Sequence, residues 1–178
     1  GGIRPQAVAG VSLGEMAALT WAGSFCPEDG FRLTVRRGAL MQAAAQRHPG
    51  GMAAVLKLPE QQVETLCRAS PSVHPVNYNC PGQLVVAGVR AAGGRTVPLP
   101  VSGAFHSPYM AETADLFYRE LSSYLFHPPK IPVYANATAA PYQPPYATLL
   151  AAQMREPVLW HKTILAMAQA GVDTFVEA

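Results

Sequence analysis

The feature that most constrains this chain is a Gly-x-Ser-x-Gly motif, Gly10-Val-Ser-Leu-Gly14, between two segments with regular patterns. Residues 6–12 are typical of a short buried strand, and residues 13–23 of an Ala-rich helix. Two glycines around a serine at such a junction allow a sharp, strained turn that exposes the hydroxyl above a helix N-terminus. The motif therefore predicts a nucleophile elbow with Ser12 at its corner.

The residue after the serine has a role of its own in such an elbow. The backbone N–H of Leu13 would point to the place where a substrate carbonyl oxygen develops negative charge, and the helix dipole would add to it. Leu13 thus supplies one half of an oxyanion hole. Because the motif also occurs in ordinary turns that contain glycine and serine, a purely structural turn is the alternative.

A serine hydroxyl needs a base within hydrogen-bonding distance to act as a nucleophile. Of the five histidines, only His106 lies in a loop dense with small residues. The others lie at chain breakers or beside a tryptophan and read as surface residues: His48, His74, His127 and His161. We expect His106 to be the base, and the alternative is a loop histidine that bonds to solvent or backbone.

The order of the remaining patterns indicates an α/β protein. After the elbow helix we expect a helix over 27–46, followed by a β-α-β-β-β unit over 52–100 in which a second helix is reduced to 89–95. The last expected elements, in chain order, are a loop with a histidine (102–108), a helix (109–125), a strand (131–136), two helices (147–154 and 160–170) and a strand (174–177).

Composition argues against several other classes of protein. No segment approaches the roughly 20 uninterrupted apolar residues of a membrane span, and the first ten residues lack the arrangement of a signal peptide. Cys26, Cys67 and Cys80 follow no disulfide or zinc-ligand spacing, which favours a reducing cytoplasm and no metal site. A net charge of +2 with scattered Lys and Arg argues against nucleic acid as a partner.

Five sequence blocks together are far more specific than the serine motif alone. They are Val8–Glu15, Arg37–Gln42, Asn79–Val86, Leu99–Pro108 and Gln153–Trp160, and they include Arg37-Gly-Ala-Leu-Met-Gln42 and Gly103-Ala-Phe-His106. In residues and in order, the blocks resemble the malonyl-CoA:acyl-carrier-protein transacylases, over nearly the whole chain.

The resemblance implies a ping-pong transfer in which Ser12 attacks malonyl-CoA and His106 takes its proton. It places Arg37 at the malonyl carboxylate, which a planar guanidinium matches bidentately, so that Arg37 would select a dicarboxylic acyl group. The alternative for Arg37 is a solvated charge on a helix face. The implied acceptor is the phosphopantetheine thiol of an acyl carrier protein, and no cofactor is needed besides the coenzyme A thioester substrate.

The resemblance also assigns residues that shape the site. Gln153 would orient the His106 imidazole through its backbone carbonyl, in place of the acid of a triad. Phe105 would narrow the pocket beside the acyl α-carbon, as in members that use malonyl rather than branched groups. Asn79 would line the site, although an Asn-x-Pro-Gly turn has a sufficient backbone reason to exist.

For the fold, the resemblance implies an α/β class with a hydrolase-like core and a parallel sheet, plus an inserted ferredoxin-like small subdomain. We expect residues 1–49 and 99–178 to form the large acyltransferase subdomain and 50–98 the small one. The protein is expected to be a cytoplasmic monomer that supplies fatty-acid or polyketide synthesis.

The sequence departs from the family pattern in several places. It lacks the usual first strand with a Gly-Gln-Gly loop, which donates the second oxyanion N–H, and the glycine-rich loop that usually follows the last block. Val11 stands where a histidine often precedes the serine. Together with the short stretch after Gly88, these departures predict either a fragment of a longer chain or a chain whose disordered segments are not included in this sequence.

Two alternative functions stay open at this point. A serine hydrolase or thioesterase shares the elbow, but α/β-hydrolases place an acid between the serine and a late histidine, whereas here no clear acid precedes His106. A non-catalytic homologue that docks carrier proteins is the second alternative. The presence of Ser12, His106 and Arg37 together argues against it.

Overall fold

Two β-sheets of different kinds organise the fold, which the computed structural model describes for residues 4–88 and 96–177. The elements in chain order are β1 (Val8–Ala9), α1 (Leu13–Trp21), α2 (Pro27–Arg47), β2 (Gly51–Leu56), α3 (Glu60–Arg68), β3 (Val73–Cys80), β4 (Gln83–Gly88), β5 (Thr96–Pro98), the 3₁₀ turn η1 (Pro108–Met110), α4 (Ala111–Leu121), β6 (Val133–Tyr134), α5 (Tyr146–Ala152) and α6 (Trp160–Gln169). The α/β class predicted from the sequence is confirmed.

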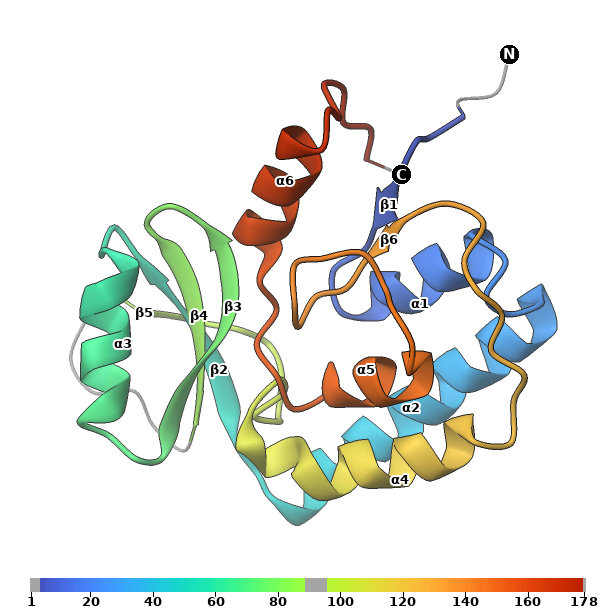
Figure 1. The fold of residues 1–178 in the computed structure, drawn as a ribbon. Coiled ribbons are helices and arrows are strands. Elements are labelled where there is room, and N and C mark those ends of the chain that lie inside the picture. The colour runs from blue at the N-terminus through green and yellow to red at the C-terminus, as the bar shows by residue number, and fades with distance from the viewer. Residues whose placement is uncertain (1–3, 89–95, 178) are drawn as a thin grey trace.

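The parallel sheet pairs two short strands that are far apart in the sequence. β1 runs parallel to β6, with Val8 opposite Val133 and Ala9 opposite Tyr134. Helices α1, α2, α4 and α5 gather on one side of the molecule around this pair (Figure 1). Their fully buried side chains form most of the larger core, which includes Met16, Leu19, Leu33, Phe117 and Leu150, together with Met154 from the segment after α5. Because Ser12 lies three residues after the end of β1, this core fixes the base of the elbow.

The antiparallel sheet has the strand order β3-β4-β2-β5. Successive side chains of a strand point to opposite faces, so β4 packs both ways. Leu84 and Val86 lie in a cluster with Val63 and Cys67 of α3, whereas Val85 and Ala87 lie in a second cluster that includes Ala104 from the loop before His106. The second face of this sheet therefore supports the histidine loop.

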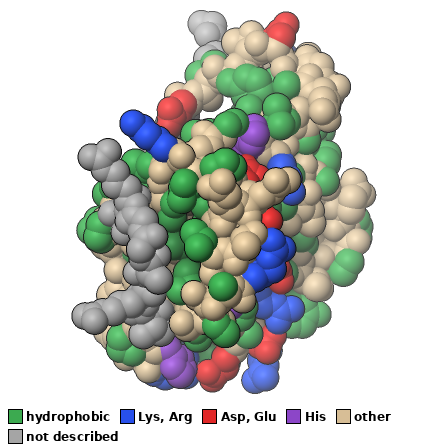
Figure 2. Space-filling view, turned by 90° about the vertical axis from the view of Figure 1, so that its left-hand side faces the viewer, with side chains coloured by type: hydrophobic (Ala, Val, Ile, Leu, Met, Phe, Trp, Pro, Cys, Tyr) green, Lys and Arg blue, Asp and Glu red, His purple; other side chains and the backbone are tan. Residues whose placement is uncertain are grey.

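One face of the molecule shows the outer side of this sheet and α3 (Figures 1 and 2). Lys and Arg side chains lie there among acidic and apolar ones.

The described helices include none that is both long and apolar enough to cross a membrane.

A short extended segment after α5 joins the two sheets. Val158 forms a parallel bridge with Asn77 of β3, and its backbone N–H and C=O bond to Val76 and Tyr78. The next residue, Leu159, donates its N–H to the carbonyl of Asn136, which follows β6. Residues 153–159 therefore lie at the junction of both sheets.

The expected strand over 174–177 is wrong. Residues 172–177 are mostly exposed and pair with no described strand, and without such a ladder their backbone groups have no reason to be extended. The expected helix over 109–125 begins with η1 and its α-helical part ends at Leu121. The reduced helix expected at 89–95 falls outside the described residues.

The elbow turn depends on a close backbone approach at Gly10. A Cβ at Gly10 would lie 2.2 Å from the carbonyl carbon and oxygen of Gly14. These are backbone atoms of α1, so they cannot move away from the added atom as a flexible side chain would. We expect Gly10→Ala to lower the free energy of unfolding by about 3 kcal/mol or more, in the upper range for overpacking. Chemical denaturation measures this change.

The matched control is Gly38→Ala in the interior of α2, where an added Cβ meets nothing within 4 Å. Alanine is favoured over glycine in a helix by about 0.5–1 kcal/mol, so this variant should be as stable as the parent or more so. Equal loss of stability in the two variants would contradict the prediction.

Candidate active site

The structure brings the hydroxyl of Ser12 and the imidazole of His106 together across 94 positions of sequence. Ser12 Oγ lies 2.8 Å from His106 Nε2. Both residues have backbone φ angles in the left-handed region, 54° for Ser12 and 58° for His106. Residues other than glycine rarely adopt this conformation, and such strain persists only where surrounding contacts hold it. Both residues of this pair are thus held in unfavourable backbone conformations.

Asn136, two residues after the end of β6, holds the Ser12 backbone. Its Oδ1 accepts the Ser12 N–H at 2.6 Å, and its Nδ2 donates to the Gly10 carbonyl at 2.8 Å. The sequence reasoning did not identify Asn136. The signal that could have found it is an amide residue at the carboxyl end of the expected strand 131–136, because the carboxyl ends of neighbouring parallel strands meet at one edge of a sheet.

The hydrogen bond made by His106 Nδ1 determines which atom is the donor in the contact between Ser12 Oγ and His106 Nε2. Nδ1 lies 2.8 Å from the backbone oxygen of Gln153, so Nδ1 carries the proton and donates it. Nε2 is then free to accept from Ser12 Oγ. Burial lowers the pKa of His106 to about 4, and the positive charge of Arg37 acts in the same direction. The imidazole is therefore neutral at physiological pH.

Arg37, in the middle of α2, is buried, with 3% of its surface exposed. Its Nη2 donates to Ser12 Oγ at 3.0 Å and to Gln153 Oε1 at 2.8 Å. Burial lowers the pKa of Arg37 to about 10, although the charge of Glu15 opposes this, so Arg37 remains a cation. Its Nε is buried and bonds to no described residue. The neighbouring Arg36 is exposed and forms a surface ion pair with Glu120.

A buried polar network lies beneath the serine. Gln153 Nε2 donates to the Ser12 carbonyl at 2.6 Å and to Glu15 Oε2 at 3.0 Å. Glu15 Oε1 accepts from the Tyr142 hydroxyl. Burial raises the pKa of Glu15 to about 7, against the hydrogen bonds that it accepts and the charge of Arg37.

The sequence reasoning assigned no role to Glu15 or Tyr142. A glutamate in the first turn of an otherwise apolar helix was the available signal for Glu15. For Tyr142 we find no local signal, because its partner Glu15 is 127 positions away.

The other residues predicted for the site, Leu13, Phe105 and Asn79, lie outside the side-chain hydrogen bonds that join Ser12, His106 and Arg37. Leu13 is the first residue of α1, where backbone N–H groups have no partner within the helix. Phe105 packs against both the larger core and the sheet cluster, and its ring fills the space beside Gly103. Asn79 lies half-buried in β3, and no described hydrogen bond joins it to Ser12, His106 or Arg37.

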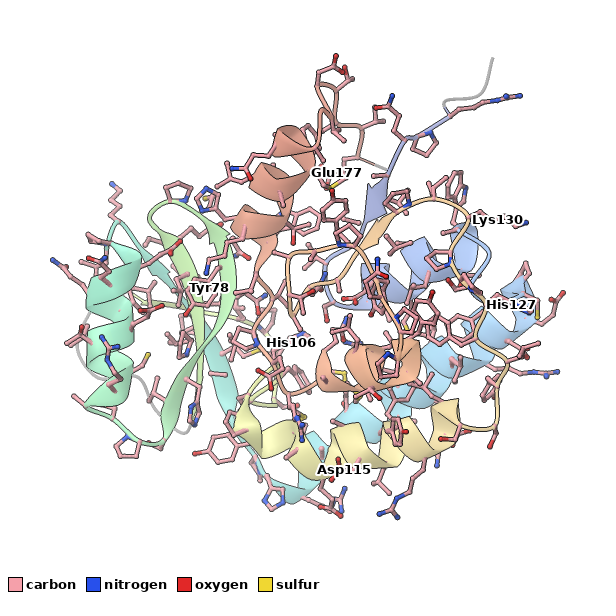
Figure 3. All side chains as sticks on the ribbon, in the orientation of Figure 1. Tyr78, His106, Asp115, His127, Lys130 and Glu177 are labelled. Carbon is pink, nitrogen blue, oxygen red and sulfur yellow. The ribbon has the colours of Figure 1, made fainter. Side chains whose placement is uncertain are left out.

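His106 lies between the antiparallel sheet and the helices around the parallel strands (Figure 3). An open groove with a volume of about 400 Å³ runs beside its imidazole. The groove is lined by His74, Pro75, Pro108, Ala111, Arg155, Glu156 and Pro157. Within residues 4–88 and 96–177, no group of three or more His, Cys, Asp or Glu residues is placed to hold a metal ion.

A serine at a strand-to-helix corner, bonded to a neutral imidazole, defines the class of α/β proteins arranged for nucleophilic catalysis. The sequence matches the acyl transferase domain family over residues 1–178. The chain therefore belongs to the acyl transferase domain family.

Known proteins similar to this chain agree with that assignment. It is 42% identical to the polyketide biosynthesis protein ThaF of Burkholderia thailandensis, over 97% of this chain and 16% of that protein. It is 36% identical to the malonyl CoA-acyl carrier protein transacylase of Salmonella typhimurium, over 99% of this chain and 63% of the relative. The chain thus spans less than two thirds of the length of either relative.

Among solved structures, one neighbour is a malonyl-transacylase in complex with a type II polyketide-synthase acyl carrier protein. It superimposes with a TM-score of 0.90 at 33% identity, over 97% of this chain and 61% of the other.

The His106 geometry predicts an unusually low pKa that depends on Arg37. In a histidine NMR titration, with the resonance assigned by its loss in His106→Gln, His106 should titrate near pH 4. Arg37→Ala removes a positive charge that lowers this pKa, so the midpoint should move to higher pH. A midpoint at or above the ordinary value of about 6.5 in the parent would contradict the prediction.

Proposed function

We propose that this chain carries the catalytic part of a malonyl-CoA:acyl-carrier-protein transacylase that works through a malonyl ester of Ser12. The observation that carries the proposal is the buried guanidinium of Arg37, 3.0 Å from the Ser12 hydroxyl. In malonyl-CoA a single methylene separates the free carboxylate from the thioester carbon. A cation that binds the carboxylate must therefore lie close to the nucleophile, as Arg37 does.

Arg37 has hydrogen-bond donors that can bind the malonyl carboxylate. Its Nε is buried without a partner among the described residues, and leaving such a group unpaired is unfavourable. A carboxylate of the substrate would supply the missing acceptor and offset the buried charge. Acetyl and other neutral acyl groups lack that acceptor, so the site favours a dicarboxylic acyl group.

In the first half-reaction, Ser12 Oγ bonds to the thioester carbon while His106 Nε2 takes its proton. The Leu13 N–H binds the oxyanion that develops on the carbonyl oxygen. The carbon–sulfur bond then breaks, His106 returns the proton to the coenzyme A sulfur, and the malonyl group stays on Ser12. In the second half-reaction the phosphopantetheine thiol gives its proton to His106 and attacks the ester, and Ser12 recovers the proton as it leaves.

The backbone carbonyl of Gln153 takes the place of the acid in a conventional triad. It holds the imidazole orientation and accepts from the imidazolium that forms, at 2.8 Å. A bound malonyl carboxylate neutralises Arg37, which is one cause of the low pKa of His106. Substrate binding would thus make His106 a stronger base when the base is needed.

We extend the proposal to the architecture and the partners. The strand order β3-β4-β2-β5 with α3 on one face supports a ferredoxin-like small subdomain at 50–98, inserted into a hydrolase-like core formed by 1–49 and 99–178. Phe105 would border the acyl pocket, and Asn79 would line the cleft from the small subdomain. The partners are malonyl-CoA and an acyl carrier protein of fatty-acid or polyketide synthesis.

The remaining parts of the proposal concern the whole protein. We propose a cytoplasmic monomer that needs no cofactor. The contact between His106 Nδ1 and a backbone carbonyl favours transfer over the hydrolase alternative, whose triad uses a carboxylate at this position. The Ser12–His106 contact argues against the carrier-docking alternative.

Intact-protein mass after brief incubation of the complete natural protein with malonyl-CoA or acetyl-CoA tests the proposal. We expect a malonyl adduct that Ser12→Ala abolishes and that passes to added carrier protein. Arg37→Ala should slow malonyl loading about 100-fold, since a buried charged hydrogen bond is lost, and should affect acetyl loading less. The neighbouring exposed arginine provides the matched control Arg36→Ala, which should load like the parent.

Each contrary result identifies an alternative. Rapid release of free malonate without carrier protein would favour the hydrolase. The absence of an adduct from either thioester would favour the carrier-docking homologue.

A further inference from the structure

Glu15 is a fully buried carboxyl group that the proposed mechanism does not use. It lies in the first turn of α1, three residues after Ser12, and has no exposed surface. Its Oε1 accepts from the Tyr142 hydroxyl, and its Oε2 accepts from Gln153 Nε2 at 3.0 Å and from the Asn136 N–H at 3.2 Å. A buried carboxyl group is unfavourable unless its surroundings compensate it, so its placement here calls for an explanation.

The partners of Glu15 are the residues that hold the reacting groups. Gln153 donates to the Ser12 carbonyl at 2.6 Å and accepts from Arg37 Nη2 at 2.8 Å. Asn136 accepts from the Ser12 N–H at 2.6 Å. Asn136 thus binds the N–H of Ser12 and Gln153 binds its carbonyl, and Glu15 accepts a hydrogen bond from each of these two residues. No described hydrogen bond joins the Glu15 side chain to the Ser12 hydroxyl or to His106.

The Gln153 amide can occupy its place in two orientations, related by exchange of its oxygen and nitrogen. In the observed orientation, the oxygen faces the Arg37 cation and the NH₂ group faces the Glu15 carboxylate. The flipped amide would place its donors against the guanidinium and its oxygen against the carboxylate, and both contacts would be repulsive. A negative charge on Glu15 therefore selects one orientation of Gln153.

We infer that Glu15 is a positioning residue for malonyl transfer: its carboxylate fixes the Gln153 amide, and through that amide the Arg37 guanidinium and the Ser12 backbone. This inference rests on the proposed function, because it concerns how well Arg37 and Ser12 are placed for malonyl-CoA.

The titration of Glu15 offers a way to test this role. Burial raises its pKa to about 7, opposed by the hydrogen bonds from Tyr142, Gln153 and Asn136 and by the Arg37 charge. The titratable groups that face Glu15 are Tyr142, from the loop after β6, and Arg37, from α2. Burial holds the pKa of Tyr142 well above its ordinary value, and the pKa of Arg37 is about 10. Near neutral pH, Glu15 is thus the group of this cluster that changes charge.

The experiment compares the complete natural protein with Glu15→Gln, which keeps the shape of the side chain and removes its charge. We expect malonyl loading by the parent to decline below an inflection near pH 7, because the protonated carboxyl group of Glu15 no longer selects one orientation of the Gln153 amide. Glu15→Gln should lower kcat/KM for malonyl-CoA at pH 8 at least tenfold, lower it less for acetyl-CoA, and lack the inflection. The exposed carboxyl of α4 provides the control Glu112→Gln, which should match the parent at every pH.

A second variant, Tyr142→Phe, leaves Glu15 in place but removes a hydrogen bond that lowers its pKa. The inflection should therefore move to higher pH. This variant decides the question if Glu15→Gln does not fold, and an inflection that stays in place or moves to lower pH would overturn the inference.

Modification of Ser12 by phenylmethylsulfonyl fluoride separates this inference from the proposed function, because it requires no malonyl-CoA. A parent protein that is modified but never loads malonyl would refute the proposed function, and slower modification of Glu15→Gln would then still support its hold on Ser12. If Glu15→Gln is folded and equals the parent in malonyl loading, pH profile and Ser12 modification, the positioning role is wrong.

Discussion

The site depends on one backbone constraint, the positive φ of Ser12 in the turn between β1 and α1. This conformation raises the hydroxyl above the N-terminus of α1, and it is unfavourable for any residue with a Cβ. Two distant side chains compensate for it: Asn136 accepts the Ser12 N–H, and Gln153 donates to the Ser12 carbonyl. The close approach of Gly10 to α1 completes the turn. The nucleophile is therefore held by the tertiary structure rather than by its local sequence.

The Gln153 side chain also connects the serine to a pair of buried charges. Arg37 and Glu15 lie on opposite sides of the Gln153 amide, which accepts from the cation and donates to the anion. Each charge offsets part of the unfavourable burial of the other, and each shifts the pKa of the other toward its ordinary value. The ring of His106 hydrogen-bonds to the Gln153 backbone carbonyl and the Ser12 hydroxyl rather than to either charge, which suits a base that must be neutral before it acts.

Residues 153–159 connect the chemistry to the architecture. Gln153 lies at the start of this segment and contacts Ser12, Arg37 and His106, while Val158 at its end bridges to β3 of the antiparallel sheet. The groove beside His106 lies where this segment meets that sheet, because His74 and Pro75 line one wall and residues 155–157 another. A movement of the antiparallel sheet relative to the helices would thus change the shape of the groove beside His106.

Regular patterns and motifs in the sequence determined much of this picture. The strand, turn and helix around Ser12, the α/β class and the order of most elements follow from local periodicity and turn chemistry, which short segments carry by themselves. His106 could be predicted as the one histidine in a loop of small residues, whereas the importance of Arg37 and Gln153 could be predicted only because their blocks resemble a family. The strand expected at 174–177 failed because a strand exists only beside a partner, which periodicity cannot report. Asn136, Tyr142 and the carboxyl of Glu15 were missed because their contacts join positions more than 100 residues apart. Only the tertiary structure decides which polar side chains share a buried space, since hydrogen bonds and charge interactions depend on distance in space and leave no periodic mark in the sequence.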